Sequence, residues 1–292
     1  MTVSAGTDAG DESGPPGALP VVLLVHGQPG AGADFSALEG LLSPSHRVLA
    51  PDRPGWGSNS RQACGMAANA DALAEMLAEA AIQEPVTVVG HSFGGGVALE
   101  LALNHPERVS ALVLLGSVGV GEALSGFDRL LAVPMLGSGI LRAGTATVRR
   151  AFVRARRYSK SHPGGRVGEM LPDLPSVRAA IGADFGPIVG RSRQSFLVEQ
   201  RAMFAETPEL ERSLLRIGVP TAVVSGEADH VVPVTAARSL VARVPGAELV
   251  IMPGGHFLPF DHPEQVAVVV RRYAALPPHL KGERPQRGTP GA

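Results

Sequence analysis

The chain has 292 residues, 45% of them hydrophobic, and a formal net charge of -1 at pH 7. This length and composition allow a large buried core, in one domain or two smaller ones. The balanced charge excludes a whole-chain electrostatic case for nucleic acid binding. The single cysteine, Cys64, excludes an internal disulfide, and the sequence has no Cys and His cluster at metal-ligand spacing, so we expect no metal.

The two ends of the chain lack hydrophobic periodicity. Residues 1–18 and 277–292 are rich in loop-forming residues, which predicts a disordered leader and a disordered tail. The leader carries acids rather than a basic start with an apolar stretch, unlike a secretory signal. The longest weakly polar run, 130–140, is too short to cross a bilayer. We therefore expect a cytoplasmic protein without an integral membrane segment.

Between these ends, short apolar runs alternate with helical patterns. The runs are rich in β-branched residues and nearly free of charge, which is typical of parallel strands covered on both faces. They lie at 20–25, 46–51, 85–90, 110–116, 220–226 and 247–252, and amphipathic patterns lie at 68–82, 95–106, 235–244 and 262–276. This alternation predicts an α/β fold with a doubly wound, mostly parallel sheet of about six strands.

One long segment interrupts the alternation. From about 120 to 218 no good strand pattern occurs, and helical pieces are separated by "VPMLGSG", "SHPGG" and "LPDLP". This predicts a helical cap inserted over one edge of the sheet, at 120–218, between the two parts of a core at 19–119 and 219–276. Within the cap, "RRAFVRARRYSK" (149–160) is either a solvated arginine-rich helix face or a surface for an acidic partner or an anionic membrane.

The run "GHSFG" (90–94) matches the pattern G-x-S-x-G between a predicted strand and a predicted helix. A serine on such a sharp turn has strained backbone angles, and Gly90 and Gly94 are expected to avoid clashes with neighbouring elements. The turn places Ser92 above the carboxyl ends of the strands, where ligands bind in open α/β sheets. Ser92 is therefore our predicted nucleophile.

A serine hydroxyl needs a general base, which an acid orients. His256 follows the last strand on a glycine-preceded loop at the same sheet edge as Ser92, and it is the predicted base. Asp229 follows the preceding strand and is the predicted acid, with Glu122 as the alternative. The resulting chain order of Ser92, Asp229 and His256 is the order that the motif predicts.

The remaining histidines are assigned to other roles. His26 and His91 lie in glycine turns, which favours buried structural hydrogen bonds. Four histidines lie in polar loops or tails and are expected to be solvated: His46, His105, His162 and His279. His262 begins a helix beside Pro263 and is a predicted cap, while His230 follows Asp229 immediately in the same loop.

Attack on a carbonyl produces an oxyanion, which two backbone N–H groups can stabilise. One predicted donor is the N–H of Phe93, directly after the nucleophile. The second is expected in "HGQPG" (26–30), where Gln28 is favoured because Pro29 has no N–H. An ordinary tight turn is the alternative interpretation of this run.

Five blocks of the sequence together resemble the α/β-hydrolase fold superfamily, in its serine-nucleophile branch of esterases, lipases and haloperoxidase-like enzymes. The blocks occur in the family order: "VHGQPG", "DRPGWGSN", "GHSFGGGVALELALNHPERVSALVLLGSVG", "SGEADHVVP" and "GGHFLPFDHPE". The resemblance implies a cofactor-free hydrolase with Ser92, Asp229 and His256 as its triad and a cap that shapes the pocket. It also implies carbonyl chemistry, because relatives that attack halides or epoxides have an aspartate at the nucleophile position.

The chain departs from the family pattern at its start. Family members usually have a two-strand hairpin before the strand that precedes "HG", and the residues before Val21 show no alternating pattern. We therefore expect six parallel strands rather than eight.

These observations predict hydrolysis of an ester, lactone or thioester through an acyl-enzyme. Perhydrolysis, acyl transfer and C–C bond hydrolysis are alternatives for the same triad, and a non-catalytic ligand-binding receptor is a further one. Trp56, Leu131 and Met135 are predicted either to line an apolar pocket for a small-molecule substrate or to pack as core. No nucleic acid partner and no integral membrane segment are expected, and the oligomeric state stays open.

Overall fold

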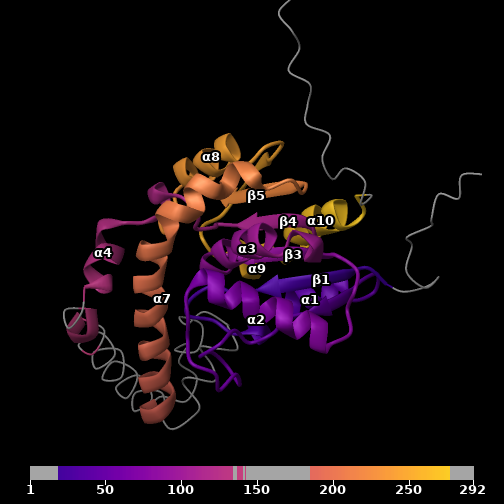
Figure 1. The fold of residues 1–292 in the computed structure, drawn as a ribbon. Helices are drawn as coiled ribbons and strands as arrows, with labels where there is room; N and C mark the ends of the chain where they lie inside the picture. Colours follow the sequence, from indigo (N-terminus) through magenta and orange to yellow (C-terminus); the bar gives the residue numbers. More distant parts are fainter. Residues whose placement is uncertain (1–18, 134–136, 141, 143–184, 277–292) are drawn as a thin grey trace, which may run out of the picture.

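The computed structural model describes residues 19–133, 137–140, 142 and 185–276 (Figure 1). The predicted leader and tail, Met135 and the arginine-rich stretch at 149–160 lie outside the described residues, as do His162 and His279.

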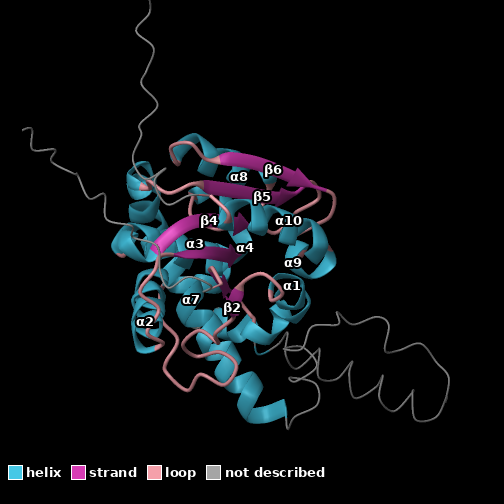
Figure 2. Cartoon of the chain, turned by 90° about the vertical axis from the view of Figure 1, so that its right-hand side faces the viewer, coloured by secondary structure: helices cyan, strands magenta, loops and turns pink. Residues whose placement is uncertain are grey.

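Six parallel strands form one sheet, in the order β2-β1-β3-β4-β5-β6. Figure 2 shows β4, β5 and β6 side by side in this sheet. The strands are β1 (Val21–Val25), β2 (Arg47–Leu49), β3 (Val86–His91), β4 (Val109–Leu115), β5 (Thr221–Gly226) and β6 (Glu248–Met252). The chain leaves β1 toward β2 and leaves β3 toward β4, in opposite directions. The crevice between the carboxyl ends of β1 and β3 is therefore the switch point where ligands bind in open α/β sheets.

All six predicted strands are present, and the predicted fold class is confirmed. Strands β3 and β5 are buried at every position, which explains why their sequences are apolar on both faces. Strand β2 is shorter than predicted. It lies at the edge of the sheet and ends before Pro51, which cannot donate a backbone hydrogen bond to a neighbouring strand.

Helices cover both faces of the sheet, because alternate strand residues point to opposite sides. Leu23 and Val25 of β1 pack in a core with α2 (Met66–Glu79), α3 (Phe93–Asn104) and α8 (Val234–Arg243). Val22 and Leu24 pack in a second core. The helical elements of that second core are η1 (Gly32–Phe35), α1 (Ser36–Leu42), α9 (Leu258–Asp261) and α10 (Pro263–Ala274). The predicted doubly wound arrangement is therefore confirmed.

The described part of the segment between β4 and β5 contains helices and no strand. Its elements are η3 (Gly121–Ala123), α4 (Gly126–Ala132), α7 (Phe185–Ser213) and η5 (Leu214–Arg216), and the short η2 (Pro106–Arg108) precedes β4. The long helix α7 packs against α4 and also contacts α2 and α3 (Figure 1). No helix within the described ranges is both long enough and apolar enough to span a membrane.

Candidate active site

Ser92 occupies the sharp turn between the last residue of β3 and the first residue of α3. Its φ of 55° and ψ of -120° lie in a region that non-glycine residues rarely adopt. The backbone N–H of Ser92 donates to the carbonyl oxygen of Leu115 at 2.9 Å, and its carbonyl oxygen accepts from Gly95 and Val118. These bonds hold the strained residue in place at the switch point.

The glycines around Ser92 are required by close contacts between backbones. A Cβ atom on Gly90 would overlap the carbonyl oxygen of Gly94. A Cβ atom on Gly94 would overlap the carbonyl oxygen of Val25, at the end of β1. The expected steric role of both glycines is confirmed, since the start of α3 approaches the backbones of β3 and β1 too closely for a side chain.

His256 and Asp229 form a buried hydrogen bond. Nδ1 of His256 lies 2.9 Å from Oδ2 of Asp229, and the Asp229 side chain has no exposed surface. The other carboxylate oxygen accepts backbone N–H groups of Val231 and Val232, each at 2.8 Å. Because a carboxylate only accepts, Nδ1 of His256 carries the proton and Nε2 is left with a lone pair.

Two opposing effects act on the Asp229 carboxyl group. Burial favours its neutral form, whereas the hydrogen bond and charge of His256 and the two backbone donors favour the carboxylate. The effects that favour the carboxylate prevail, so the pKa of Asp229 lies below its ordinary value. A carboxylate in this position orients the imidazole ring and can stabilise a positive charge on it.

Ser92, His256, Gln28 and Phe93 line one cavity of about 320 Å³. Most of its other walls are apolar and come from α7 and from the segments that follow β4, β5 and β6: Val118, Ala123, Phe196, Met203, Val231, Val232, Phe257 and Phe260. The structure thus brings the predicted nucleophile, base and both predicted oxyanion donors to one space, with Asp229 behind the base.

The two predicted oxyanion donors come from opposite sides of the crevice. Phe93 is the first residue of α3, so its N–H has no acceptor within the helix. Gln28 lies on the loop after β1 and is followed by Pro29, which has no N–H. The side-chain amide of Gln28 donates to Oε1 of Gln200 on α7 at 2.9 Å.

Two further histidines at the site have structural roles, as predicted. His91 donates from Nε2 to the carbonyl oxygen of His256 at 2.9 Å, and burial lowers the pKa of His91 to about 3. His26 donates from Nδ1 to the carbonyl oxygen of Gly27 and accepts the backbone N–H of Arg53 at Nε2, with its pKa also lowered by burial. Both rings are therefore neutral, and each one holds a loop of the site.

Trp56 and Leu131 lie in the core, the second of their two predicted roles, and do not line the cavity. The indole N–H of Trp56 donates to Glu199 at 2.8 Å. His46, expected to be solvated, is only 7% exposed. The alternative acid Glu122 is exposed and accepts a hydrogen bond from Ser239 instead of His256.

Sequence reasoning missed the contribution of α7 to the cavity. Phe196, Gln200 and Met203 lie on one face of this helix, at spacings of four and three residues. That spacing was visible in the sequence. It does not reveal which face of a helix meets the site, because both cavity walls and core contacts use the same periodicity.

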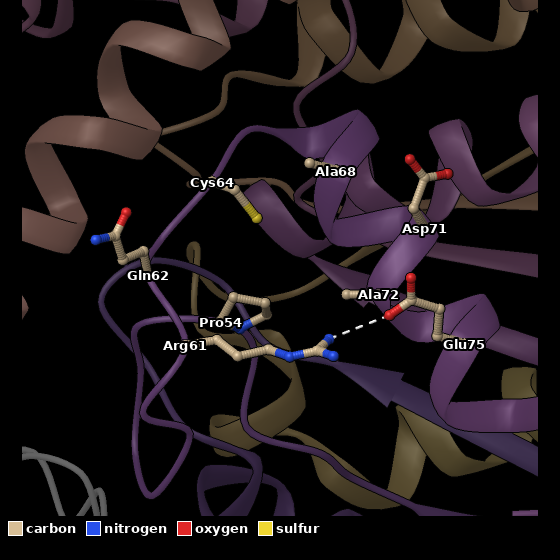
Figure 3. A pocket seen from close by; sticks show the side chains of 8 residues that line it. All are labelled: Pro54, Arg61, Gln62, Cys64, Ala68, Asp71, Ala72 and Glu75. Carbon is tan, nitrogen blue, oxygen red and sulfur yellow. Dashed lines mark hydrogen bonds and ion pairs between the residues drawn. The ribbon is translucent and has the colours of Figure 1, made fainter. Parts of the chain in front are cut away.

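A second, more open pocket lies away from Ser92, between the loop after β2 and α2 (Figure 3). Arg61 and Glu75 cross it as an exposed ion pair at 3.2 Å. The only thiol, Cys64, has its pKa raised to about 11 by burial and is therefore not a thiolate at neutral pH. This pocket lacks an activated nucleophile, and within the described ranges no cluster of three or more His, Cys, Asp or Glu could hold a metal ion.

A sequence model of the alpha/beta hydrolase family matches residues 22–269. The chain belongs to this family. This alpha/beta hydrolase is 30% identical over 262 residues to 2-hydroxymuconate semialdehyde hydrolase of Pseudomonas putida, covering 87% of this chain and 86% of that protein. It is 29% identical over 262 residues to a pimeloyl-[acyl-carrier protein] methyl ester esterase of Neisseria meningitidis, covering 88% of this chain and 94% of that protein.

The fold of this alpha/beta hydrolase is similar to that of a thermophilic esterase from Thermogutta terrifontis. The TM-score is 0.63 at 24% identity, with 91% of this chain and 92% of the esterase covered. The sequence resemblance and the hydrolase class that it implies are therefore confirmed.

Proposed function

We propose that this hydrolase cleaves an ester-like carbonyl compound, namely an ester, lactone or thioester, through an acyl-enzyme on Ser92. The observation that carries the proposal is the buried hydrogen bond between Asp229 and His256, because it leaves Nε2 of His256 as a base in the cavity that Ser92 lines. Ser92 in its strained turn, Asp229 and His256 are then the catalytic triad.

The first half of the reaction forms a bond between Oγ of Ser92 and the carbonyl carbon. Nε2 of His256 takes the hydroxyl proton, and the N–H groups of Gln28 and Phe93 stabilise the charge on the carbonyl oxygen. Asp229 stabilises the imidazolium that results. The bond to the leaving group then breaks, and His256 transfers its proton to the departing oxygen or sulfur.

The second half returns Ser92 to its starting state. His256 takes a proton from a water molecule, which attacks the acyl carbon and forms a second oxyanion. The bond to Ser92 then breaks, its oxygen regains the proton from His256, and a carboxylic acid leaves. The reaction needs no redox partner, because every step moves only protons and an acyl group.

The cavity favours a small, largely apolar substrate. Its volume of about 320 Å³ lies at the lower end of the range for small-molecule sites, and its walls are mainly aliphatic and aromatic. One relative is named as a methyl ester esterase, which supports ester chemistry for this chain.

Hydrolysis of a C–C bond is the second candidate reaction. It is favoured by the relative from Pseudomonas putida, whose named substrate is a semialdehyde rather than an ester. The same nucleophile, base and oxyanion donors would serve, so the two candidates differ in substrate and not in the residues of the triad.

A chromogenic short-chain ester tests the proposal on the wild type and on Ser92→Ala. Loss of a triad nucleophile should lower kcat by about 1,000-fold or more. Ser117→Ala is the matched control, because Ser117 is also buried and nearby but its hydroxyl donates to the carbonyl oxygen of Val118 at 2.7 Å. Equal rates for wild type and Ser92→Ala would refute the proposal.

Labelling with a fluorophosphonate followed by peptide mapping identifies the nucleophile directly. The label is expected on Ser92, and a label on Ser117 would refute the assignment. Assays of esters with increasing acyl-chain length and of a vinylogous diketone then separate the two candidate reactions. An ester hydrolase should have the higher kcat/KM for the esters, and a C–C hydrolase for the diketone.

A further inference from the structure

Arg53 is a fully buried arginine beside the loop that carries Gln28. Its Nε donates to the carbonyl oxygen of His26 at 2.8 Å, and its Nη2 donates to the carbonyl oxygen of Gly27 at 2.9 Å. Its guanidinium carbon also lies 4.7 Å from the ring centroid of Phe93. One side chain therefore touches both segments that carry the proposed oxyanion donors.

The bond to Gly27 determines where the N–H of Gln28 points. The carbonyl of Gly27 and the N–H of Gln28 belong to the same peptide group, and in a planar trans peptide these two bonds point in opposite directions. Fixing the carbonyl oxygen therefore aims the N–H. Two donors hold it here, Nη2 of Arg53 at 2.9 Å and Nδ1 of His26 at 2.8 Å.

Glu199 on α7 holds Arg53 in turn. Its carboxylate pairs with Nη1 of Arg53 and lies 3.3 Å from Nη2, and it also accepts the indole N–H of Trp56. Neither side chain of the Arg53–Glu199 pair has any exposed surface. A buried ion pair rarely stabilises a fold more than apolar residues of similar volume would. Stability alone therefore does not explain why a charged pair is buried here.

The next residue of α7 holds the same loop at a second point. Gln200 is fully buried, donates from Nε2 to Asp128 and accepts from Nε2 of Gln28. Asp128 can only accept, which fixes the orientation of both amides along this chain. Two consecutive buried polar residues of α7 thus hold the loop after β1.

We propose that Arg53, held by Glu199, is a positioning residue that aims the N–H of Gln28 into the oxyanion hole, so that the hole is complete only while α7 is docked. This role rests on the proposed function, because it concerns the oxyanion hole of that same reaction. Arg53 touches neither the substrate nor the reacting atoms, and it acts through the backbone of Gly27.

Glu199→Gln is the first test variant, because it keeps the size of the side chain and removes the charge that holds Arg53. We expect kcat to fall by about 10- to 100-fold with KM changed less than about 3-fold, since outright loss of an oxyanion donor costs about 100- to 1,000-fold in kcat. Glu211→Gln is the matched control on the same helix, where Glu211 pairs with Arg243 at 2.8 Å away from the cavity. Its kcat should equal that of the wild type.

The double variant Arg53→Met/Glu199→Leu separates positioning from stability. It replaces the buried pair by apolar side chains, which is expected to leave a folded protein. If Arg53 only stabilises the fold, a double variant with a wild-type midpoint of unfolding should also have the wild-type kcat. If Arg53 positions the loop, kcat stays low because the carbonyl of Gly27 keeps only the His26 donor. Wild-type kcat in the folded double variant would overturn the proposal.

Amide hydrogen exchange provides a readout that does not depend on catalysis. In Glu199→Gln and in the double variant, exchange of the peptide containing residues 26–28 should become faster by on the order of 10-fold, with the loop of Asp229 unchanged. Unchanged exchange at 26–28, or equal acceleration throughout the sheet, would overturn the positioning role. Ser92→Ala with wild-type activity would instead refute the proposed function and leave the exchange result to decide the role of Arg53.

Discussion

Asp229 and His256 are 27 positions apart in the chain, and the buried carboxylate of Asp229 accepts a hydrogen bond from Nδ1 of His256 at 2.9 Å. The two loops that carry them leave the neighbouring strands β5 and β6. This contact distinguishes Asp229 from Glu122, the other acid that the sequence allowed.

Asp229→Asn should lower kcat by about 10,000-fold, because an amide in place of the carboxylate favours the wrong tautomer of His256. Steady-state kinetics on the ester measure this loss, and circular dichroism verifies that the variant is folded. Glu122→Gln is the control and should keep the wild-type rate. The reverse result, with Glu122→Gln inactive and Asp229→Asn active, would reassign the acid.

The lowered pKa of His91 predicts that the protein becomes less stable as the pH falls. Burial lowers its pKa to about 3 in the folded state, compared with an ordinary value of 6.5, so the unfolded chain binds the proton first. Between about pH 6.5 and pH 3 the free energy of unfolding should therefore decrease with decreasing pH. Denaturant unfolding across this range should show a smaller slope for His91→Gln, and an identical slope would contradict the prediction.

Gly94→Ala should destabilise the fold, since its Cβ atom would overlap the carbonyl oxygen of Val25 and neither backbone can easily move. Overpacking of this kind costs about 1–3 kcal/mol. Gly40→Ala is the matched control, because Gly40 lies in α1 with open space around its Cβ position and should gain about 0.5–1 kcal/mol from helix propensity. Urea unfolding of the two variants should give changes of opposite sign.

Phe196→Ala should shift substrate preference toward larger acyl groups, because Phe196 forms part of the cavity wall. One or two methylene groups in an apolar pocket are worth about 10- to 200-fold in kcat/KM, so the ratio of hexanoate to acetate ester should rise by about 10-fold or more. Phe204→Ala on the same helix is the control, since Phe204 packs on the core and does not line the cavity. An unchanged ratio in Phe196→Ala would place the acyl group elsewhere.

Most of the sheet and the residues around Ser92 follow from local patterns. Strands β3 and β5 are recognisable as apolar runs because they are buried at every position. Gly90 and Gly94 mark the turn because a Cβ atom at either position would overlap the backbone. His256 and Asp229 were placed together by one topological rule, that loops after parallel strands meet at one edge of the sheet.

The rest depends on contacts that no local pattern encodes. For Trp56 the sequence left pocket wall and core open as alternatives, because its partner is distant in the chain: the indole N–H donates to Glu199, 143 positions away. His46 lies in a polar stretch, yet it is buried beside Ser45. The partners of Arg53 and Gln28 lie on α7, whose docking face is set by tertiary packing rather than by its own periodicity.

The Arg53–Glu199 pair also limits how the segment between β4 and β5 can be exchanged, in evolution or in chimeric enzymes. A replacement segment without a carboxylate at this position would leave a guanidinium unpaired in the interior, at a cost of about 3–5 kcal/mol. The sheet scaffold and α7 are therefore coupled through this pair of charges. A graft that is meant to change specificity has to carry both charges or replace both.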